Sequence, residues 1–323
     1  MSNYNSTSTS SNVIAISLPT IPHTIRFWYF LCCDILSLSC SFLTLYFLFS
    51  DRILYRAVNN HIFIVLLFIG ILYELIDVSW ILRNTLYDTP WQMSSTFYLF
   101  WAFFDYSIYS LQIGLFSWAT IERHIIIFHE KWISSRIKRI FIHYLPIIII
   151  ITYYMTFYSI IYYSTSCNNS FNSFLQGGIY GPCLFDKLFI VNWDLVGNQI
   201  IPTLTIAISS FVLIIRVVKR KNRVNQIIRW RKYRKMTIQL VSVSCIYVVF
   251  NSPWVIIIWS VQASAISFDT FLSSMIYAKF LLYNIIFLFP IVCCLSMQEL
   301  RKKFKAFSNF FQQRQRIGIT RTV

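Results

Sequence analysis

Hydrophobic residues in this chain gather into seven long stretches that are separated by polar segments. The stretches cover residues 27–50, 61–82, 97–121, 140–163, 195–218, 236–261 and 273–297. Each is long enough to supply the roughly 20 residues that a helix needs to cross about 30 Å of hydrocarbon. The pattern predicts an all-α membrane protein: a seven-helix bundle over residues 25–297, preceded by a tail at 1–24 and followed by a segment at 298–323.

The basic residues predict how this bundle is oriented. All but four of the 28 Lys and Arg lie in the segments 51–60, 122–139 and 216–235 or after residue 297. The four exceptions are Arg26, Arg83, Lys187 and Lys279. Because cationic loops stay on the cytoplasmic side, we expect the N-terminus outside the cell and the C-terminus in the cytoplasm. The net charge of +16 then belongs beside the anionic inner leaflet, and it gives no reason to expect nucleic-acid binding.

Composition agrees with a multi-pass protein whose main partner is the lipid bilayer. Hydrophobic residues make up 57% of the chain and charged residues only 12%, a balance that disfavours a soluble globular class. Two glycosylation sequons begin at Asn5 and Asn168, and both fall on the side that is expected to be outside. We therefore expect a glycoprotein of the plasma membrane.

The third stretch ends in Glu122-Arg123-His124, where the chain enters the cytoplasm. This triplet resembles the acidic-Arg-aromatic triplet of the rhodopsin-like G-protein-coupled receptors, and the resemblance extends over nearly the whole chain. It implies that the triplet receives a heterotrimeric G protein. The alternative is a charged helix end, where an arginine interacts favourably with the helix dipole.

Other positions carry the same resemblance. Pro202, Pro253 and Pro290 fall where the family has its kink-forming prolines in spans five, six and seven. The segment 298–304 resembles the short amphipathic eighth helix. An apolar stripe continues along it and past it, formed by Leu300, Phe304, Phe307 and Phe311. In the family, agonist binding swings the inner end of span six outward, here about Pro253.

The chain also departs from the family pattern. Tyr98 stands where the family has a cysteine in span three. The usual bridge to the outer loop is therefore missing, and the comparison implies a bridge between Cys167 and Cys183 instead. Asn251 replaces the family's tryptophan near Pro253. The activation switch is expected to differ from the family's accordingly.

Asp105 is the sharpest candidate for a ligand site, because an ionisable group in hydrocarbon usually faces the protein interior or water. It precedes Arg123 by 18 residues, which is five helical turns or about 27 Å, so both side chains share one face. Tyr109 and Gln112 lie on that face as well. In the family, this aspartate position resembles the anchor of protonated amines. The alternative is an internal ion pair with Lys279, which would satisfy both charges without a ligand.

We expect an extracellular ligand to meet the following side chains: Asp105, Tyr109, Gln112, Asn251, Lys279 and Tyr283. An opsin is disfavoured because Tyr283 stands where the family's retinal-bearing lysine would fall. The second hypothesis is a seven-helix transporter or channel, although no internal repeat supports it. An enzyme is third, since the sequence shows neither an HExxH metal pair nor a nucleophile elbow. No catalytic residue, metal or cofactor is expected.

Overall fold

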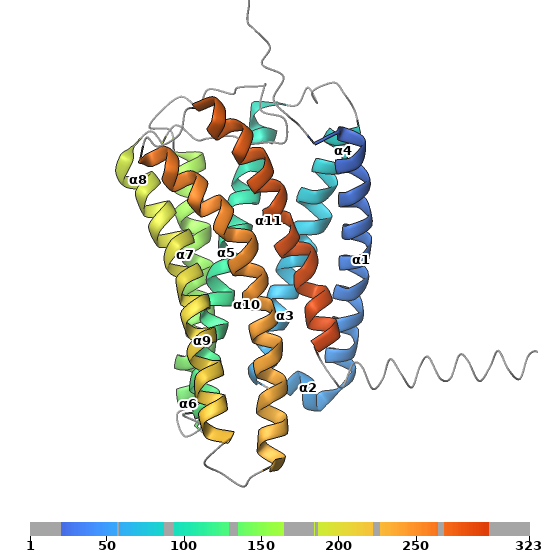
Figure 1. The fold of residues 1–323 in the computed structure, drawn as a ribbon, viewed down its shortest axis with the longest axis vertical. Coiled ribbons are helices and arrows are strands. Elements are labelled where there is room, and N and C mark those ends of the chain that lie inside the picture. The colour runs from blue at the N-terminus through green and yellow to red at the C-terminus, as the bar shows by residue number, and fades with distance from the viewer. Residues whose placement is uncertain are drawn as a thin grey trace, which may run out of the picture.

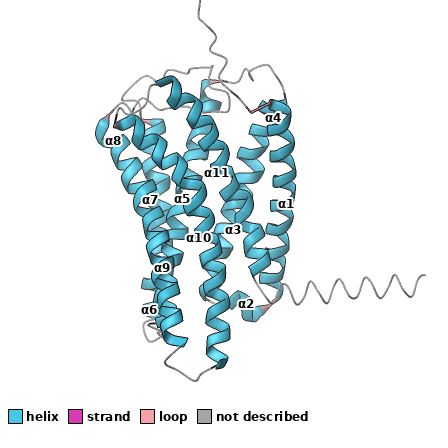
Figure 2. Ribbon diagram, in the orientation of Figure 1, coloured by secondary structure: helices cyan, strands magenta, loops and turns pink. Residues whose placement is uncertain are grey.

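Every regular element in the computed structural model is a helix, within the residues that the structure describes. Those residues are 21–56, 58–86, 94–128, 135–164, 184, 187–221, 227–263 and 268–296. The long helices run roughly side by side along one axis (Figures 1 and 2). The protein is therefore all-α in its described part, as the hydrophobic pattern predicts.

The first half of the bundle contains α1 (His23–Ser50), α2 (Arg52–Arg56), α3 (Val58–Tyr73), η1 (Glu74–Val78), α4 (Ser79–Leu86) and α5 (Ser95–Phe128). The second half contains α6 (Arg136–Arg139), η3 (Ile140–Tyr144), α7 (Leu145–Tyr163), α8 (Leu188–Trp193), η5 (Asp194–Ile200), α9 (Ile201–Lys221), α10 (Ile227–Gln262) and α11 (Phe268–Ser296). The three η elements are π-helical segments. Each joins two α-helices into one continuous rod, so the short helices on either side belong to longer membrane-sized units.

Six of these units are long and apolar enough to cross a membrane. They are His23–Ser50, Asn60–Leu86, Ile137–Tyr163, Leu188–Val217, Thr237–Ser260 and Tyr277–Leu295. They match six of the seven predicted stretches to within seven residues at either end. The remaining stretch, 97–121, lies inside α5, which is 34 residues long. α5 is not among the six apolar units, because polar and charged residues lower its hydropathy.

α5 lies in the interior of the bundle, in contact with α3, α7 and α9. Across the core, the Phe116 ring stacks on the Tyr247 ring of α10 with 4.6 Å between centroids. The outward faces of other helices carry large exposed apolar side chains, such as Phe42, Ile148 and Phe211. Extensive exposed apolar surface is unfavourable in water but suits hydrocarbon, so these faces support a multi-pass membrane protein.

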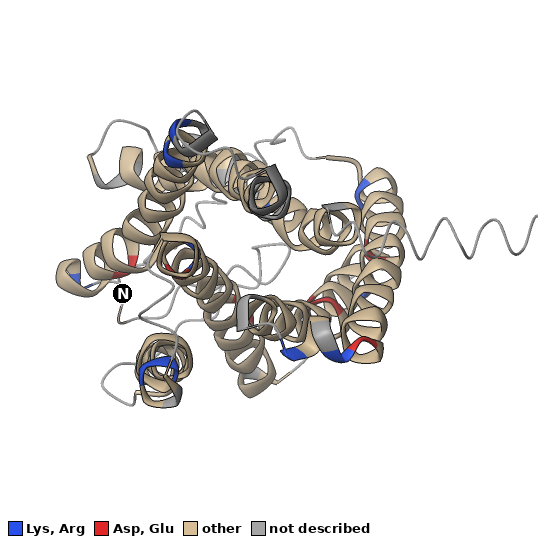
Figure 3. Cartoon of the chain, turned by 90° about the horizontal axis from the view of Figure 1, so that it is seen from below, with Lys and Arg blue, Asp and Glu red and all other residues tan. Residues whose placement is uncertain are grey.

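The described parts of the basic segments lie at one end of the bundle. α2, α6 and the adjoining ends of α9 and α10 form the lower end in Figure 1, whereas α4 and α8 lie near the upper end. Figure 3 views the lower end along the helices, with Lys and Arg in blue. We name the lower end the inner end, after its predicted side, and the opposite end the outer end.

The prolines of the sequence comparison lie within helices. Pro253 is inside α10 and Pro290 inside α11, and Pro202 is the second residue of α9, directly after η5. Several predicted features lie outside the described residues. These are Asn5, Asn168, Cys167, Cys183 and the amphipathic segment with the tail at 298–323.

Close helix packing gives a test of the fold at Gly114 of α5. A Cβ atom placed there would lie 2.4 Å from the ring of Tyr154 in α7, and Tyr154 is itself buried. Overpacking of this kind costs about 1–3 kcal/mol. Gly114→Ala is therefore expected to lower the melting temperature of the purified protein in lipid nanodiscs.

Gly70→Ala is the matched control, because the added Cβ would have its nearest neighbour, Nε2 of Gln112, at 3.4 Å. Both changes give the same gain in helix propensity, so the difference between them reports packing. Equal melting temperatures for the two variants would contradict the close contact between α5 and α7.

Candidate functional site

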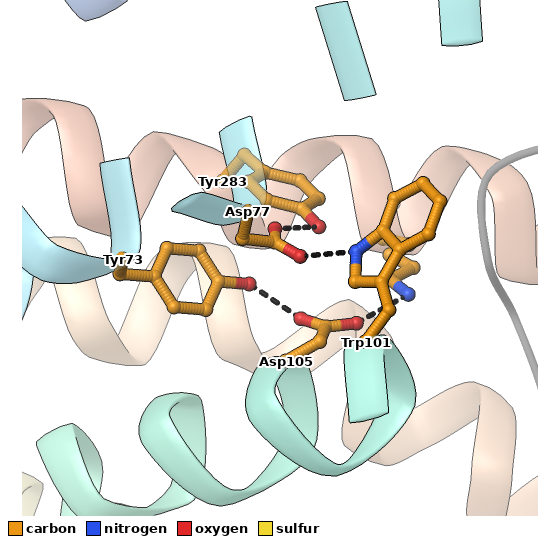
Figure 4. A network of polar contacts seen from close by, with 6 residues as sticks. Tyr73, Asp77, Trp101, Asp105 and Tyr283 are labelled. Atoms are coloured by element: carbon orange, nitrogen blue, oxygen red, sulfur yellow. Dashed lines mark hydrogen bonds and ion pairs between the residues drawn. The ribbon is translucent and has the colours of Figure 1, made fainter. Parts of the chain in front are cut away.

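A buried polar network occupies the interior between α5, η1 and α11 (Figure 4). Both carboxylate oxygens of Asp105 are used. Oδ1 accepts a hydrogen bond from the hydroxyl of Tyr73 at 2.5 Å, and Oδ2 accepts one from Nζ of Lys279 at 2.6 Å. The ammonium of Lys279 also lies 5.7 Å from the ring centre of Tyr106, within cation–π range. The structure thus joins Asp105 and Lys279 in an ion pair that is largely buried.

A second carboxylate, Asp77 of η1, belongs to the same network. Its Oδ1 accepts from Nε1 of Trp101 at 2.6 Å, and its Oδ2 accepts from the hydroxyl of Tyr283 at 2.8 Å. Asp77 is fully buried. When both carboxyls are ionised, the six residues drawn in Figure 4 hold two negative charges and one positive charge. The network therefore has one negative charge in excess, which a proton or a cationic group could neutralise.

The other expected ligand-site residues lie further along α5 toward the inner end. The Tyr109 hydroxyl donates to Oδ1 of Asn251 at 2.8 Å, and Nδ2 of Asn251 donates to Oγ1 of Thr203 at 2.7 Å. This bridge links α5, α10 and α9. Gln112 is buried beside Gly70 of α3. Asp105, Tyr109 and Gln112 are all buried, and so is every residue around α5 from 107 to 117.

Sequence reasoning missed a second buried network, between α5, α7 and η5. Asp194 accepts from the hydroxyl of Tyr158 at 2.6 Å and from Nδ2 of Asn198 at 2.9 Å. The Tyr158 hydroxyl also meets Oγ of Ser110 at 2.7 Å, and Gln199 donates to that serine at 3.1 Å. Asp194 stands one residue before the predicted stretch 195–218, so a span drawn slightly longer would have flagged it as an intramembrane acid.

At the inner end, the three side chains of the Glu122-Arg123-His124 triplet take different directions. The Arg123 guanidinium lies over the ring of Phe63 in α3, 5.0 Å from its centre, and the side chain is 3% exposed. Nε2 of His124 lies 2.7 Å from the carbonyl oxygen of Ser209 in α9. Oε1 of Glu122 contacts Nδ1 of His143 in η3. All three side chains of the triplet thus contact neighbouring helices, whereas the side chains of a solvated helix end would face water.

The Asp105–Lys279 ion pair allows a test of whether Asp105 stabilises the fold. Breaking a buried ion pair strands one charge and costs about 3–5 kcal/mol. Asp105→Asn removes the carboxylate that Lys279 contacts directly, and Lys279→Met leaves two carboxyls without a cation. Each change is therefore expected to reduce thermal stability and surface expression substantially. The double variant should recover much of that loss, because neither charge is then left unpaired.

The measurement is a double-mutant cycle on the melting temperature in nanodiscs and on surface level in cells. Lys187→Met serves as the control, because Lys187 is exposed before α8 and its loss should change little. Small, additive effects of the two network substitutions would show that the pair does not support the fold.

Comparison with known proteins does not assign the chain to a family. No protein-family model matches the chain, and no curated protein is significantly similar to it. The function is therefore argued from the arrangement of the residues themselves.

Proposed function

We propose that this chain is a divergent rhodopsin-like G-protein-coupled receptor of the plasma membrane. In this proposal α5 is the third of seven transmembrane helices and the N-terminus is extracellular. The segment 298–323 contains a short amphipathic eighth helix, beginning at 298–304, and the cytoplasmic tail. An extracellular ligand binds in the outer half of the bundle. Its binding activates a heterotrimeric G protein at the inner end.

The observation that carries the proposal is the arrangement along α5. Asp105 and Arg123 are both buried, with exposed fractions of 6% and 3%, and they lie on one helix about five turns apart. One is held in a charged network toward the outer end, and the other lies at the inner end, where the basic segments converge. A single rigid helix therefore connects a site suited to a charged ligand with a site suited to an intracellular partner.

Side-chain contacts between these two sites offer a route for coupling. The bridge from Tyr109 to Asn251 ties α5 to α10 two residues before Pro253. Further toward the inner end, the stacked rings of Phe116 and Tyr247 tie the same two helices again. A ligand that rearranges the first contact changes the balance between two positions of α10 about Pro253. In the receptor mechanism this is a population shift that exposes Arg123 to the G protein.

With both carboxyls ionised, the excess negative charge of the Asp77–Asp105–Lys279 network favours a ligand with a cationic group. A cation that approaches Asp77 or Asp105 restores charge balance without removing Lys279. Ligand binding and the internal ion pair are therefore compatible, so the two interpretations of Asp105 need not exclude each other. The candidate ligand contacts remain Asp105, Tyr109, Gln112, Asn251, Lys279 and Tyr283.

A channel or transporter is the second candidate, and one observation favours it. Asp34 of α1 and Glu74 of η1 are buried acids, and Oδ1 of Asp34 and Oε2 of Glu74 have no hydrogen-bond partner among the described residues. Buried acids in a membrane often mark ion pathways. Ion flux through the purified protein in liposomes without any G protein would favour this candidate over a receptor.

Arg123 gives the main test of the receptor proposal. Cells that carry a panel of G proteins would be screened with amine, peptide and lipid libraries, and nucleotide exchange measured at matched surface levels. Loss of one charge-assisted contact costs about 1.5–3 kcal/mol. Arg123→Ala should therefore reduce exchange by about tenfold or more. Arg83→Ala, at the exposed outer end of α4, should signal like the parent. Normal signalling by Arg123→Ala would refute the role of the arginine.

The outer loop gives a second, independent test of orientation and chemistry. Because Tyr98 replaces the family's cysteine in span three, we propose that Cys167 and Cys183 form a disulfide in the oxidising space outside the cell. Peptide mapping without reductant should recover the two cysteines linked to each other. Finding both thiols free, or either one joined to a cysteine within a span, would overturn the assignment.

A further inference from the structure

Three titratable side chains form a continuous chain at the inner end of the bundle. His143 of η3 lies between Glu122 of α5 and His61 of α3. Its Nδ1 contacts Oε1 of Glu122, and its Nε2 lies 3.3 Å from Nδ1 of His61. Nε2 of His61 lies 2.8 Å from the carbonyl oxygen of Tyr55. The chain thus begins at a carboxyl group and ends at a backbone carbonyl.

The number of protons on this chain follows from its geometry. The Tyr55 carbonyl can only accept, so Nε2 of His61 must carry a proton. The two facing nitrogens of His61 and His143 need one proton between them, and so do Nδ1 of His143 and Oε1 of Glu122. Three hydrogen bonds therefore need three protons. A carboxylate and two neutral imidazoles together supply only two.

We propose that Glu122, His143 and His61 form a proton-binding site that holds one excess proton. With Glu122 ionised, the excess proton makes one of the two imidazoles cationic. With Glu122 protonated, both imidazoles are neutral and the total is unchanged. In each arrangement the chain has no net charge, which suits burial in a low-dielectric interior. The count of three protons is the same whichever ring nitrogen of His143 carries a proton.

Neighbouring groups influence where the proton resides. The titratable and charged side chains that face the chain from the surrounding elements are Tyr55 of α2, Arg123 of α5, Arg139 of α6 and Tyr144 of η3. Arg139 repels positive charge on His61, so it favours the excess proton nearer Glu122. The Tyr144 hydroxyl, 3.4 Å from Nδ1 of His61, is the other donor toward that nitrogen.

The site has a route to solvent and a structural consequence. His143 and Glu122 are 0% and 1% exposed, whereas His61 is only partly buried, so a proton reaches the chain through His61. Removing the excess proton leaves two lone pairs facing each other and breaks a link between α3, η3 and α5. Adding another breaks the contact between the two histidines. If the proposed receptor function holds, proton occupancy then makes the surroundings of Arg123 sensitive to cytoplasmic pH.

Proton occupancy can be measured without any ligand or G protein. The chain has five histidines, and replacing His23, His124 and His129 by Gln leaves only the proposed pair. Nitrogen-15 NMR of the labelled protein in nanodiscs at pH 7 counts protonated ring nitrogens, and infrared difference spectra against Glu122→Gln report the carboxyl group. We expect either three protonated nitrogens with an ionised Glu122, or two with a protonated Glu122.

Glu122→Gln keeps the shape of the side chain but removes its charge, so it is expected to leave two protonated nitrogens. Two protonated nitrogens beside an ionised Glu122 in the parent would overturn the proposal. So would a third protonated nitrogen that persists in Glu122→Gln. If Glu122→Gln does not fold, Glu122→Asp serves as the reference for the infrared difference spectra, because it shifts the carboxyl band. Since no signalling is measured, failure here is distinguishable from failure of the receptor proposal.

Discussion

The structure depends on one constraint: a polar or charged side chain inside a membrane bundle must find its partner within the protein. α5 shows its effect most clearly, because more polar and charged side chains are buried on this helix than on any other helix among the described residues. Asp105 is paired with Lys279, and Glu122 with His143. α5 is buried on all sides between residues 107 and 117, and the more apolar helices pack around it with their outer faces available to lipid.

The π-helical segments supply many of the partners. η1 contributes Asp77, η3 contributes His143, and η5 contributes Asp194 and Gln199. A π-helical segment contains more residues per turn than an α-helix, so it changes which side chains face the interior. Such segments occur often at functional sites. Here they bring polar groups from three different rods toward α5, and this arrangement creates both the outer network and the Glu122–His143–His61 chain at the inner end.

The polar networks at the two ends of α5 differ in their charge. With both carboxyls ionised, the outer network carries an excess negative charge around Asp77 and Asp105, whereas the proposed proton occupancy leaves the Glu122–His143–His61 chain at the inner end without net charge. Between them, the Tyr109–Asn251 bridge and the Phe116–Tyr247 stack join α5 to α10. These contacts connect α5 with α10, the helix that contains Pro253.

The sequence by itself determined the helical class and six of its seven predicted apolar spans, and it placed Asp105, Tyr109 and Gln112 on one helix face, because length, hydropathy and a period of 3.6 residues are local properties. It also identified Lys279 as a possible partner of Asp105. Only the tertiary structure decided that these two residues pair, that Asp77 and Tyr73 share their network, and that Glu122 pairs with His143. Partners from separate rods depend on how the rods rotate and pack, and the π-helical segments alter that rotation without a clear local signal in the sequence.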